Sequence, residues 1–514
     1  MDSFSRLPAT AQAAIGLFTL YLIYQAVNAI TLWRQREAIK RDKGCLPARR
    51  MSQLDPILGI DMFIANVKAL KNHRLLETGV ERFRELGGHT FQMKLLGRKL
   101  HFTTEPENLK TIQALEHKKW SLGRRRKYGF RPLLGVGIFT TDGQEWQHSR
   151  DMLRPNFARS QVGNLTELET HVRHLIAAIP HNQQVDLSEL FFRLTIDSAT
   201  EFLFGESTES LTTESATGFA EAFNYSQDFI ANSARWGPWA RLFTATKRFE
   251  NDRKFIFDFV DYFVDQGLAK RDQLLAEKSS ADRYVFIDEL VRQTPDRIRI
   301  RSELLNILLA GRDTTASLLT NAWFMLSKRP DIWKKLQAEV ARLDGALPTF
   351  EQLKELKYLK AVLNESLRLH PVVPLNSREA TEDTTLPVGG GPDGSHPLFI
   401  KKGELMVWSL YAMHRRKDYY GEDANEFRPE RWIDNAETGK KGLRPGWEYL
   451  PFNGGPRICL GQQFALTEAS YTTVRLCQAF GGIESRDSEP WIEQITLTCV
   501  SQNGAKVALN PRTS

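Results

Sequence analysis

The feature that most restricts the fold of this chain is an uncharged, mainly apolar segment near its N-terminus. No charged residue occurs from Leu7 to Trp33, and the apolar core of the segment runs from Ala13 to Ile30. About 20 consecutive apolar residues are enough for a helix to cross the hydrocarbon core of a bilayer. Residues 1–33 are therefore predicted to form a membrane anchor with a single spanning helix.

Charges on either side of this segment predict its orientation. Basic residues follow it closely, whereas Asp2 and Arg6 before it cancel. Because Lys and Arg are retained on the cytosolic side of a membrane helix, the rest of the chain is expected in the cytosol. A cleaved signal peptide is the alternative, but the leader is weakly charged and no A-x-A cleavage pattern is present. The basic residues that follow are Arg34, Arg36, Lys40, Arg41 and Lys43.

Nothing after the first fifty residues divides the chain into separate domains. A length of 514 residues corresponds to about three average domains, yet the sequence has no Gly/Ser linker, repeat or low-complexity tract. We therefore expect residues 34–57, which are basic and contain Pro47 and Pro56, to connect the anchor to one catalytic domain of residues 58–514. The net charge of +7 suits an anionic membrane surface or an acidic protein partner. No motif indicates nucleic-acid binding.

Hydrophobic periodicity predicts a mainly α-helical body with a minor β-sheet region. Phe91, Met93 and Leu95 alternate with polar residues, so residues 89–103 are expected to form a hairpin that turns at Gly97-Arg98. Short apolar runs rich in Gly and Pro predict strands and turns at residues 386–407 and over the last fifty residues. The expected helices cover residues 111–117, 142–157, 189–205, 254–275, 302–328 and 354–370, with a last one beginning near Gly461.

The cysteines favour a free thiolate over zinc binding or disulfides. None of Cys45, Cys459, Cys477 and Cys499 forms a CxxC or CxxH pair, and four cysteines in 514 residues are too few for a disulfide scaffold. A reducing compartment would leave each thiol able to bind a metal.

The strongest chemical signal is the segment FNGGPRICLG, which runs from Phe452 to Gly461. A thiolate that ligates haem iron needs a backbone that passes close beneath the flat macrocycle, and glycines permit this approach. A helix beginning near Gly461 would direct its positive end at Cys459. Arg457 could meet a haem propionate, and Phe452 could limit water near the sulfur. A buried free cysteine in a turn is the alternative. The glycines concerned are Gly454, Gly455 and Gly461.

The pattern F-x-x-G-x-R-x-C-x-G resembles the haem-binding loop of the cytochromes P450 at every fixed position, and the similarity extends over essentially the whole chain. The resemblance implies the cytochrome P450 fold, haem b (iron protoporphyrin IX) as cofactor and Cys459 as the iron ligand. It also implies a monooxygenase, in which RH, O2, two electrons and two protons give ROH and water. The thiolate donates electron density that favours O–O cleavage.

A second motif joins Glu365 and Arg368, whose spacing places them on one face of the 354–370 helix. Such a pair is usually solvated, but FRPERW follows at residues 427–432. In the family an arginine of this later segment, matched by Arg431, joins the pair. A carboxylate between two guanidiniums would hold the cysteine loop beneath the haem, which is a structural role.

A third motif is AGRDTT, residues 310–315, within the expected 302–328 helix. Gly and β-branched residues are unfavourable in a helix interior, so the motif indicates a kink. The resemblance implies that this kink makes room for dioxygen and that Asp313 and Thr314 are the acid–alcohol pair that delivers protons. A solvent-facing polar step is the alternative. Animal fatty-acid ω-hydroxylases often bond a Glu covalently to haem at the position of Ala310, so noncovalent haem binding is expected here.

Two further motifs resemble propionate ligands of the family, namely Trp146 with Arg150 at i, i+4, and Arg378. A surface role for Arg378 is the alternative. Basic clusters are either solvated faces or a docking site for an acidic electron donor. Because the chain has no flavin or nicotinamide motif, electrons are expected from NADPH through a separate NADPH–cytochrome P450 reductase, with cytochrome b5 as a second candidate donor. The clusters are residues 118–119, 124–127 and 440–441.

Three longer stretches resemble the fungal branch that hydroxylates n-alkanes and fatty acids at the terminal (ω) carbon, which implies a single-pass protein of the endoplasmic reticulum membrane with a hydrophobic small-molecule substrate. Alternatives are a tailoring oxidase of secondary metabolism, a lipid-hydroperoxide rearranging enzyme, which would not need Asp313 and Thr314, and a haem binder without activity. Aromatic residues are candidates for the access channel, although each is more often core. The stretches are residues 134–162, 383–394 and 449–471, and the aromatic residues are Phe130, Phe139, Phe223, Phe229 and Phe243.

Overall fold

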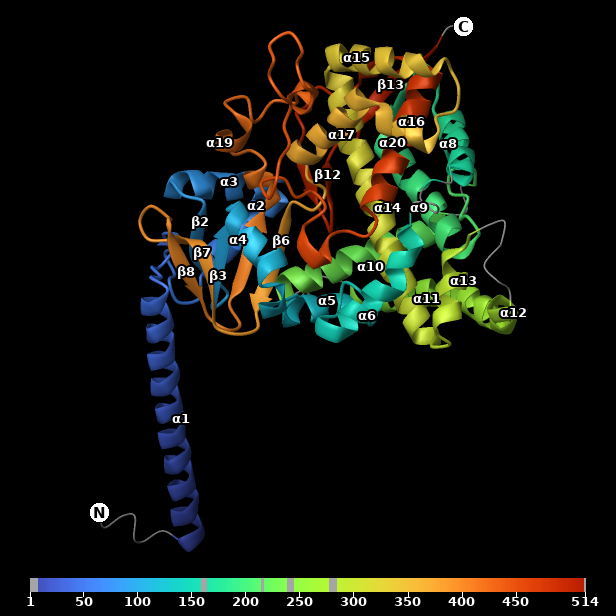
Figure 1. Ribbon diagram of the computed structural model, residues 1–514. Coiled ribbons are helices and arrows are strands. Elements are labelled where there is room, and N and C mark those ends of the chain that lie inside the picture. The colour runs from blue at the N-terminus through green and yellow to red at the C-terminus, as the bar shows by residue number, and fades with distance from the viewer. Residues whose placement is uncertain are drawn as a thin grey trace.

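The protein consists of a mainly helical body with a small sheet region on one side, and a long N-terminal helix that projects from it (Figure 1). The computed structural model describes residues 8–158, 163, 165–213, 217–237, 245–276 and 284–512. The helices are α1 Ala9–Asp42, α2 Ile60–Lys71, α3 Leu75–Leu86, α4 Pro106–Lys110, α5 Arg124–Leu134, α6 Gly143–Leu153, α8 Thr166–Ala178, α9 Leu187–Phe204, α10 Thr217–Trp236, α11 Thr246–Ala269, α12 Arg271–Ala276, α13 Phe286–Gln293, α14 Arg297–Lys328, α15 Pro330–Val340, α16 Phe350–Glu355, α17 Lys357–Leu369, α18 Leu410–Met413, α19 Lys417–Tyr420 and α20 Gln462–Ala479.

The strands form one larger mixed sheet and three small ones. The six-stranded sheet has the order β1-β2-β3-β9-β6-β4, and the smaller sheets are β10-β13-β5, β11-β12 and β7-β8. The strands are β1 Arg49–Arg50, β2 Thr90–Leu95, β3 Arg98–Thr103, β4 Trp120–Ser121, β5 Gln184–Asp186, β6 Leu375–Ala380, β7 Thr384–Gly390, β8 His396–Ile400, β9 Leu405–Ser409, β10 Phe480–Ser485, β11 Glu493–Ile495, β12 Cys499–Ser501 and β13 Lys506–Pro511.

The predicted hairpin is confirmed, with its turn one residue earlier than expected. Strands β2 and β3 pair from Thr90 with Thr103 to Leu95 with Arg98. The turn is therefore Leu96-Gly97, and both residues have positive φ, at 50° and 74°. Positive φ at both central positions matches the right-handed twist of the strands, and Gly97 accepts it without strain.

Helix α14 is the central element and crosses the body between α9, α11, α17 and α20. The side chain of Asp296 caps its N-terminus by accepting the N–H of Arg299 at 3.0 Å. Its first half packs into one apolar core with α9, α10, α11 and α13. Its second half packs into another with α15, α17 and α20. The segment of residues 310–315, which includes Arg312 and Asp313, lies between these two cores along the helix.

Most predicted helices are confirmed, but three differ in detail. The 111–117 segment contains a π-helical turn, Thr111–Leu115. The 354–370 segment is divided, because α16 ends at Glu355 and α17 begins at Lys357. The 254–275 segment is divided between α11 and α12. Helix α5 was not anticipated, because its first turn is entirely basic and it contains Pro132.

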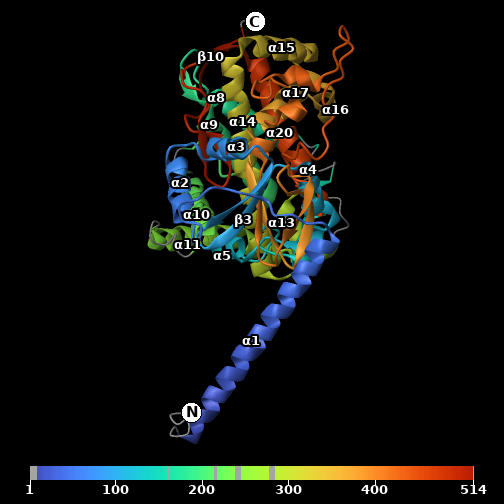
Figure 2. The ribbon, with the colours of Figure 1, turned by 90° about the vertical axis from the view of Figure 1, so that its left-hand side faces the viewer.

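Helix α1 is long and apolar enough to cross a membrane. It shows no change of structure at residue 33, because the basic segment that follows continues the same helix to Asp42. Arg36 forms an ion pair with Asp383 at 2.7 Å, and the Lys40 ammonium lies 5.5 Å from the centre of the Phe399 ring. The end of α1 is thus fastened to the body, from which the remainder projects in both views (Figures 1 and 2).

Candidate functional site

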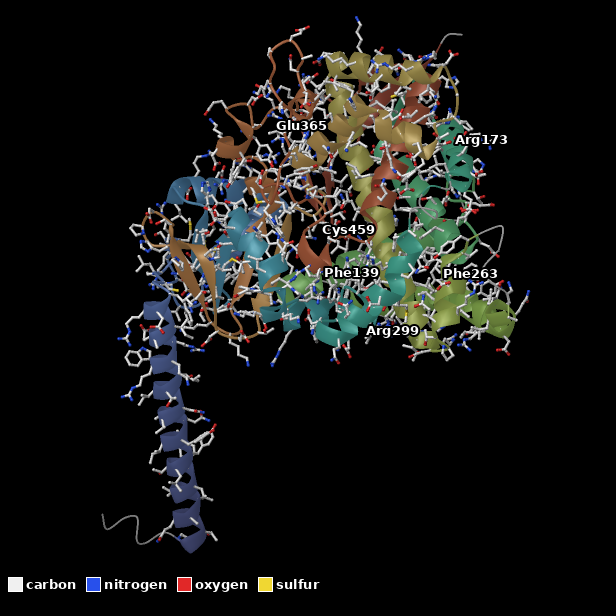
Figure 3. The ribbon with its side chains drawn as sticks, viewed as in Figure 1. Phe139, Arg173, Phe263, Arg299, Glu365 and Cys459 are labelled. Atoms are coloured by element: carbon white, nitrogen blue, oxygen red, sulfur yellow. The ribbon has the colours of Figure 1, made fainter. Side chains whose placement is uncertain are left out.

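Cys459 lies immediately before helix α20, as the sequence predicts. The backbone N–H groups of Gly461 and Gln462 donate to its sulfur, and its own N–H donates to the Phe452 carbonyl at 3.0 Å. Burial raises the pKa of the Cys459 thiol, while these amides and Arg150 lower it. The side chain is nevertheless exposed, so the sulfur lies deep in the body (Figure 3) but faces accessible space. The amides at the N-terminus of α20 are placed to stabilise a thiolate.

Two glycines of this loop lie close to other parts of the protein. A Cβ on Gly455, which has φ +64°, would lie 1.9 Å from the carbonyl oxygen of Gln113, and a Cβ on Gly454 would lie 2.7 Å from the Trp447 ring. Both glycines are therefore required by contacts with the protein itself. Gly461 differs, since an added Cβ would meet only the Phe157 ring, at 3.8 Å.

Three arginines from distant parts of the chain gather beside the loop. Burial, with the charges of Arg126 and Arg457, lowers the pKa of Arg378 to about 9. Burial also lowers the pKa of Arg126 and of Arg457 to about 10, with smaller contributions from Arg457 and from Arg150, respectively. Arg457 donates to Asp142 at 2.7 Å, but Lys127 also binds this carboxylate, at 2.9 Å. The Nε of Arg126 has no partner. Because one shared carboxylate faces one buried and two partly buried guanidiniums, the cluster carries excess positive charge, which favours an anionic ligand.

Trp146 and Arg150 both lie at the loop, but Arg150 is not part of this arginine cluster. The Arg150 guanidinium donates to the carbonyl of Ile458 at 3.0 Å. Trp146 is buried, with the Arg457 guanidinium 4.3 Å and that of Arg150 5.8 Å from its ring centre. Trp146 therefore lies near two cations, Arg150 at the loop and Arg457 in the cluster.

The Glu365 network is present as the sequence predicts, and it is complete. Arg368 donates to both carboxylate oxygens of Glu365, at 2.8 and 2.9 Å, and Arg431 donates to one of them at 2.8 Å. The indole of Trp432 also donates to Glu365, at 2.9 Å. The remaining guanidinium N–H groups reach backbone carbonyls, including that of His414. The charges are fully buried and every one is paired.

One face of α14 opens onto accessible space. From Ser302 to Phe324 every residue is buried except Ala310, Gly311 and Thr314. These three lie on one side of the helix, since their spacing is i, i+1, i+4. The predicted kink would lie within a continuous helix, because α14 remains α-helical through residues 310–315. The Thr314 hydroxyl donates to the Ala310 carbonyl at 2.7 Å, which satisfies the hydroxyl within the helix.

Asp313 points away from that face and into a polar contact between α14 and α10. It accepts a hydrogen bond from Arg312 at 2.9 Å, and the Gln227 amide also donates to it. Both Arg312 and Asp313 are buried. Asp313 is thus held by an ion pair inside the protein, and a solvent-facing polar step is excluded.

The candidate channel residues divide into core and accessible side chains. Phe130, Phe223 and Phe229 are buried in the core around α10 and α11. Phe139 is only partly buried, and its N–H donates to Asn306 of α14 at 3.0 Å. Phe243 lies outside the described residues.

Comparison with known proteins identifies the family. The cytochrome P450 family model matches residues 61–507, and the chain belongs to this family. It is therefore a haem-dependent P450 monooxygenase, an oxidoreductase. Similar proteins include the cytochrome P450 monooxygenase himC of Aspergillus japonicus, 45% identical over 98% of this chain and 90% of its own. Cytochrome P450 monooxygenase FPY7 of Fusarium mangiferae is 43% identical over 96% of this chain and 95% of its own. Cytochrome P450 52A3-B of Candida maltosa is 46% identical over 84% of this chain and 85% of its own.

The residues present fit a haem. A cysteine at a helix N-terminus supplies a thiolate, and the excess positive charge of the arginine cluster complements the two carboxylates of the macrocycle. Two residues in this arrangement were missed from the sequence. Arg126 stands in a run of basic residues that resembles a solvated face, and Trp432 has no charge to mark it as a partner of Glu365. Only their tertiary contacts identify Arg126 and Trp432 as members of the site.

Proposed function

We propose that Cys459 ligates the iron of haem b and that the enzyme hydroxylates the terminal carbon of n-alkanes or fatty acids. The observation that carries the proposal is the exposed Cys459 sulfur, which accepts two amide N–H groups at the start of α20. Bound haem supplies the activation of dioxygen, so that one oxygen atom enters a C–H bond and the other leaves as water. The residues of the protein would bind haem, orient the substrate and supply protons.

The arginine cluster would hold the propionates. Arg126, Arg378 and Arg457 offer buried donors with too few protein carboxylates, and Trp146 packs against Arg457. Arg150 would restrain the loop through the Ile458 carbonyl. Ala310 and Gly311 have small side chains that leave the accessible face of α14 open. The fully paired network of Glu365, Arg368 and Arg431 would fix the segment that leads to the cysteine loop.

Thr314 and Asp313 would have different roles in proton transfer. The Thr314 hydroxyl lies on the accessible face, where it can exchange its bond to the Ala310 carbonyl for one to a bound molecule. Asp313 lies on the other side, one residue away, and is connected through Arg312 and Gln227 to polar groups of α10. A proton would therefore pass from this polar contact to the Thr314 oxygen.

The aliphatic substrate is supported by the resemblance to the fungal alkane and fatty-acid branch and by the 52A relatives. A second candidate is a tailoring oxidase with another hydrophobic substrate, because himC and FPY7 are as similar to this chain as the 52A proteins are. We further propose an anchor of residues 1–33, a connector of residues 34–57 and a catalytic domain of residues 58–514. Electrons would come from NADPH–cytochrome P450 reductase, with cytochrome b5 as a second donor, at the endoplasmic reticulum membrane.

The test begins with the absorption spectrum of the reduced CO complex, which reports thiolate ligation. Dodecane and lauric acid are then titrated, and products are analysed with reductase and NADPH. A low-to-high-spin shift followed by ω-hydroxylated product supports the proposal. A thiolate spectrum without response to either aliphatic chain would favour the tailoring oxidase.

The proton role of Thr314 is tested separately. Thr314→Ala should retain its haem, because the Thr314 hydroxyl bonds within its own helix, but should divert electrons to hydrogen peroxide. Peroxide and product are measured per NADPH, with Thr315→Ser as a control on the neighbouring residue, whose hydroxyl is buried. Unchanged coupling in Thr314→Ala would contradict this role.

A further inference from the structure

The loop of residues 135–141, between α5 and α6, lies with its backbone directly against the first half of α14. A Cβ on Gly135, which has φ +61°, would lie 2.3 Å from the Ser302 hydroxyl. A Cβ on Gly137 would lie 2.4 Å from the amide nitrogen of Asn306. Neither position has room for a side chain, so the contact between this loop and α14 depends on groups of the helix that meet the loop backbone.

One side chain of α14, that of Asn306, binds the loop at two points. Its amide nitrogen donates to the Leu134 carbonyl at 2.9 Å and to the Ser302 carbonyl at 2.7 Å. Its oxygen accepts the N–H of Phe139 at 3.0 Å. Asn306 is fully buried, so water cannot replace it. Loss of this side chain would leave the Leu134 carbonyl and the Phe139 N–H without the partner that fixes them to the helix.

The loop is also held together by two hydroxyl groups of its own. The Thr140 hydroxyl donates to the Gly135 carbonyl at 2.7 Å and accepts the Gly137 N–H at 3.0 Å. The Thr141 hydroxyl donates to the Gly137 carbonyl at 2.7 Å. These bonds make the loop a compact unit, so its position relative to α14 is set mainly by Asn306.

This compact loop connects the accessible face of α14 to the arginine cluster. Asn306 lies one helical turn before Ala310, at spacing i, i+4, and therefore on the same side of α14. At the other end of the loop, the Arg457 guanidinium donates to the Thr141 carbonyl at 3.2 Å. Phe139 belongs to this connection, is only partly buried and lies in the central part of the body (Figure 3). A substrate above the proposed haem site would have the loop as one side wall.

We propose that Asn306 is a positioning residue for regiospecificity, because it fixes the 135–141 loop against α14 and thereby sets how far Phe139 reaches over the proposed haem site. The inference rests on the proposed function. A narrow space above the iron admits only the end of an aliphatic chain, whereas a wall that can withdraw also admits the neighbouring carbons. Asn306 acts through the loop and is not itself a catalytic residue.

Helix α14 contains a matched control for this role. Asn321 is also fully buried, and its amide donates to the Cys499 carbonyl at 3.1 Å. Its oxygen accepts the Trp491 indole N–H at 2.9 Å and the Ser501 N–H at 3.1 Å. These partners lie in β12 and just before β11, not in the loop. Asn306→Leu and Asn321→Leu should therefore have similar costs in stability, and only the first should alter regiospecificity.

The experiment uses the full-length, haem-loaded protein with reductase, NADPH and laurate. The ratio of ω- to (ω−1)-hydroxylaurate is measured, together with the rate at which CO associates with the reduced haem, which reports access to the iron without turnover. Loss of one net hydrogen bond changes the balance between two loop positions by about fivefold. We expect Asn306→Leu to lower the product ratio and to raise the CO association rate by about this factor, and Asn321→Leu to change neither.

Thr140→Val is a second variant, because it loosens the loop without changing α14, and it should shift both readouts in the same direction. It takes the place of Asn306→Leu if that protein does not fold. An unchanged product ratio and CO rate in the loop variant, or the same changes in Asn321→Leu, would overturn the inference. A wild type that hydroxylates no laurate would instead contradict the proposed function, and the CO rates alone would then decide whether Asn306 sets the width of the space above the iron.

Discussion

Two groups of buried arginines differ in how completely the protein satisfies them. In the Glu365 network, one carboxylate lies between Arg368 and Arg431, and backbone carbonyls accept the remaining donors. In the cluster of Arg126, Arg378 and Arg457, the guanidiniums repel one another and share a single carboxylate. The first group is complete as folded, and the second becomes complete only when an anion is added. Burying an unpaired charge is costly, so the second group marks a ligand site whereas the first marks a structural one.

The largest expected effect comes from breaking the complete group. Glu365→Ala leaves the buried Arg368 guanidinium without a carboxylate and Arg431 with only Asp423, at 3.5 Å, which costs about 3–5 kcal/mol. We expect the variant to fail to incorporate haem, measured as haem content per purified protein. Glu355→Ala, at the exposed end of α16, is the control. A Glu365→Ala protein with normal haem content would show that the network does not support the loop.

Glu468 is a buried carboxyl that has no arginine partner, so, unlike Glu365, it should favour its protonated form. Burial raises the pKa of Glu468 to about 7, although the Ser198 hydroxyl donates to it. The folded state therefore keeps this proton up to about pH 7, whereas the unfolded state releases it near the ordinary glutamate pKa of 4.5. Stability should fall as pH rises from 4.5 to 7, by as much as about 3 kcal/mol.

Glu468→Gln removes this proton and should flatten that part of the pH profile. The thermal unfolding midpoint is measured from pH 4.5 to 8 in the variant, the wild type and Glu355→Gln. An identical slope in wild type and Glu468→Gln would rule out a shifted pKa at this residue.

A smaller effect is expected from the incomplete group. Arg378→Met removes one unbalanced cation from the cluster and keeps a similar apolar volume. The apoprotein should therefore be no less stable than the wild type, while haem is lost about tenfold faster because a charge-assisted hydrogen bond is missing. Transfer of haem to apomyoglobin gives the rate. Arg173→Met, at an exposed site on α8 (Figure 3), is the control. Destabilisation of the apoprotein would place Arg378 with the complete group instead.

The smallest effect on the fold is expected at Gly461. An added Cβ there has space within the protein, and its φ of −85° suits any residue. Gly461→Ala should change apoprotein stability by less than about 1 kcal/mol but weaken haem retention. Gly455→Ala is the matched comparison, since its Cβ would collide with Gln113. Equal destabilisation of both apoproteins would contradict this distinction.

Local spacing explains why part of the site could be predicted from the sequence. The loop from Phe452 to Gly461 and the i, i+3 pair of Glu365 and Arg368 are short patterns whose geometry is set by neighbouring residues. The arginine cluster is different, because Arg126, Arg378 and Arg457 meet only after distant segments pack together. The contact of Gly455 with Gln113 could not be predicted either, since Gln113 comes from a distant part of the chain. The direction in which Arg126 points depends on how α5 packs, which no local pattern determines.

The unbroken course of α1 gives the anchor a mechanical role. A helix of 34 residues is about 50 Å long, and its C-terminal end is joined to the body by Arg36 and Asp383. A stiff rod with a fixed joint transmits tilt, whereas a flexible tether would let the body tumble freely. The body would therefore keep one side turned toward the bilayer, so that hydrophobic molecules arrive by diffusion in two dimensions rather than three.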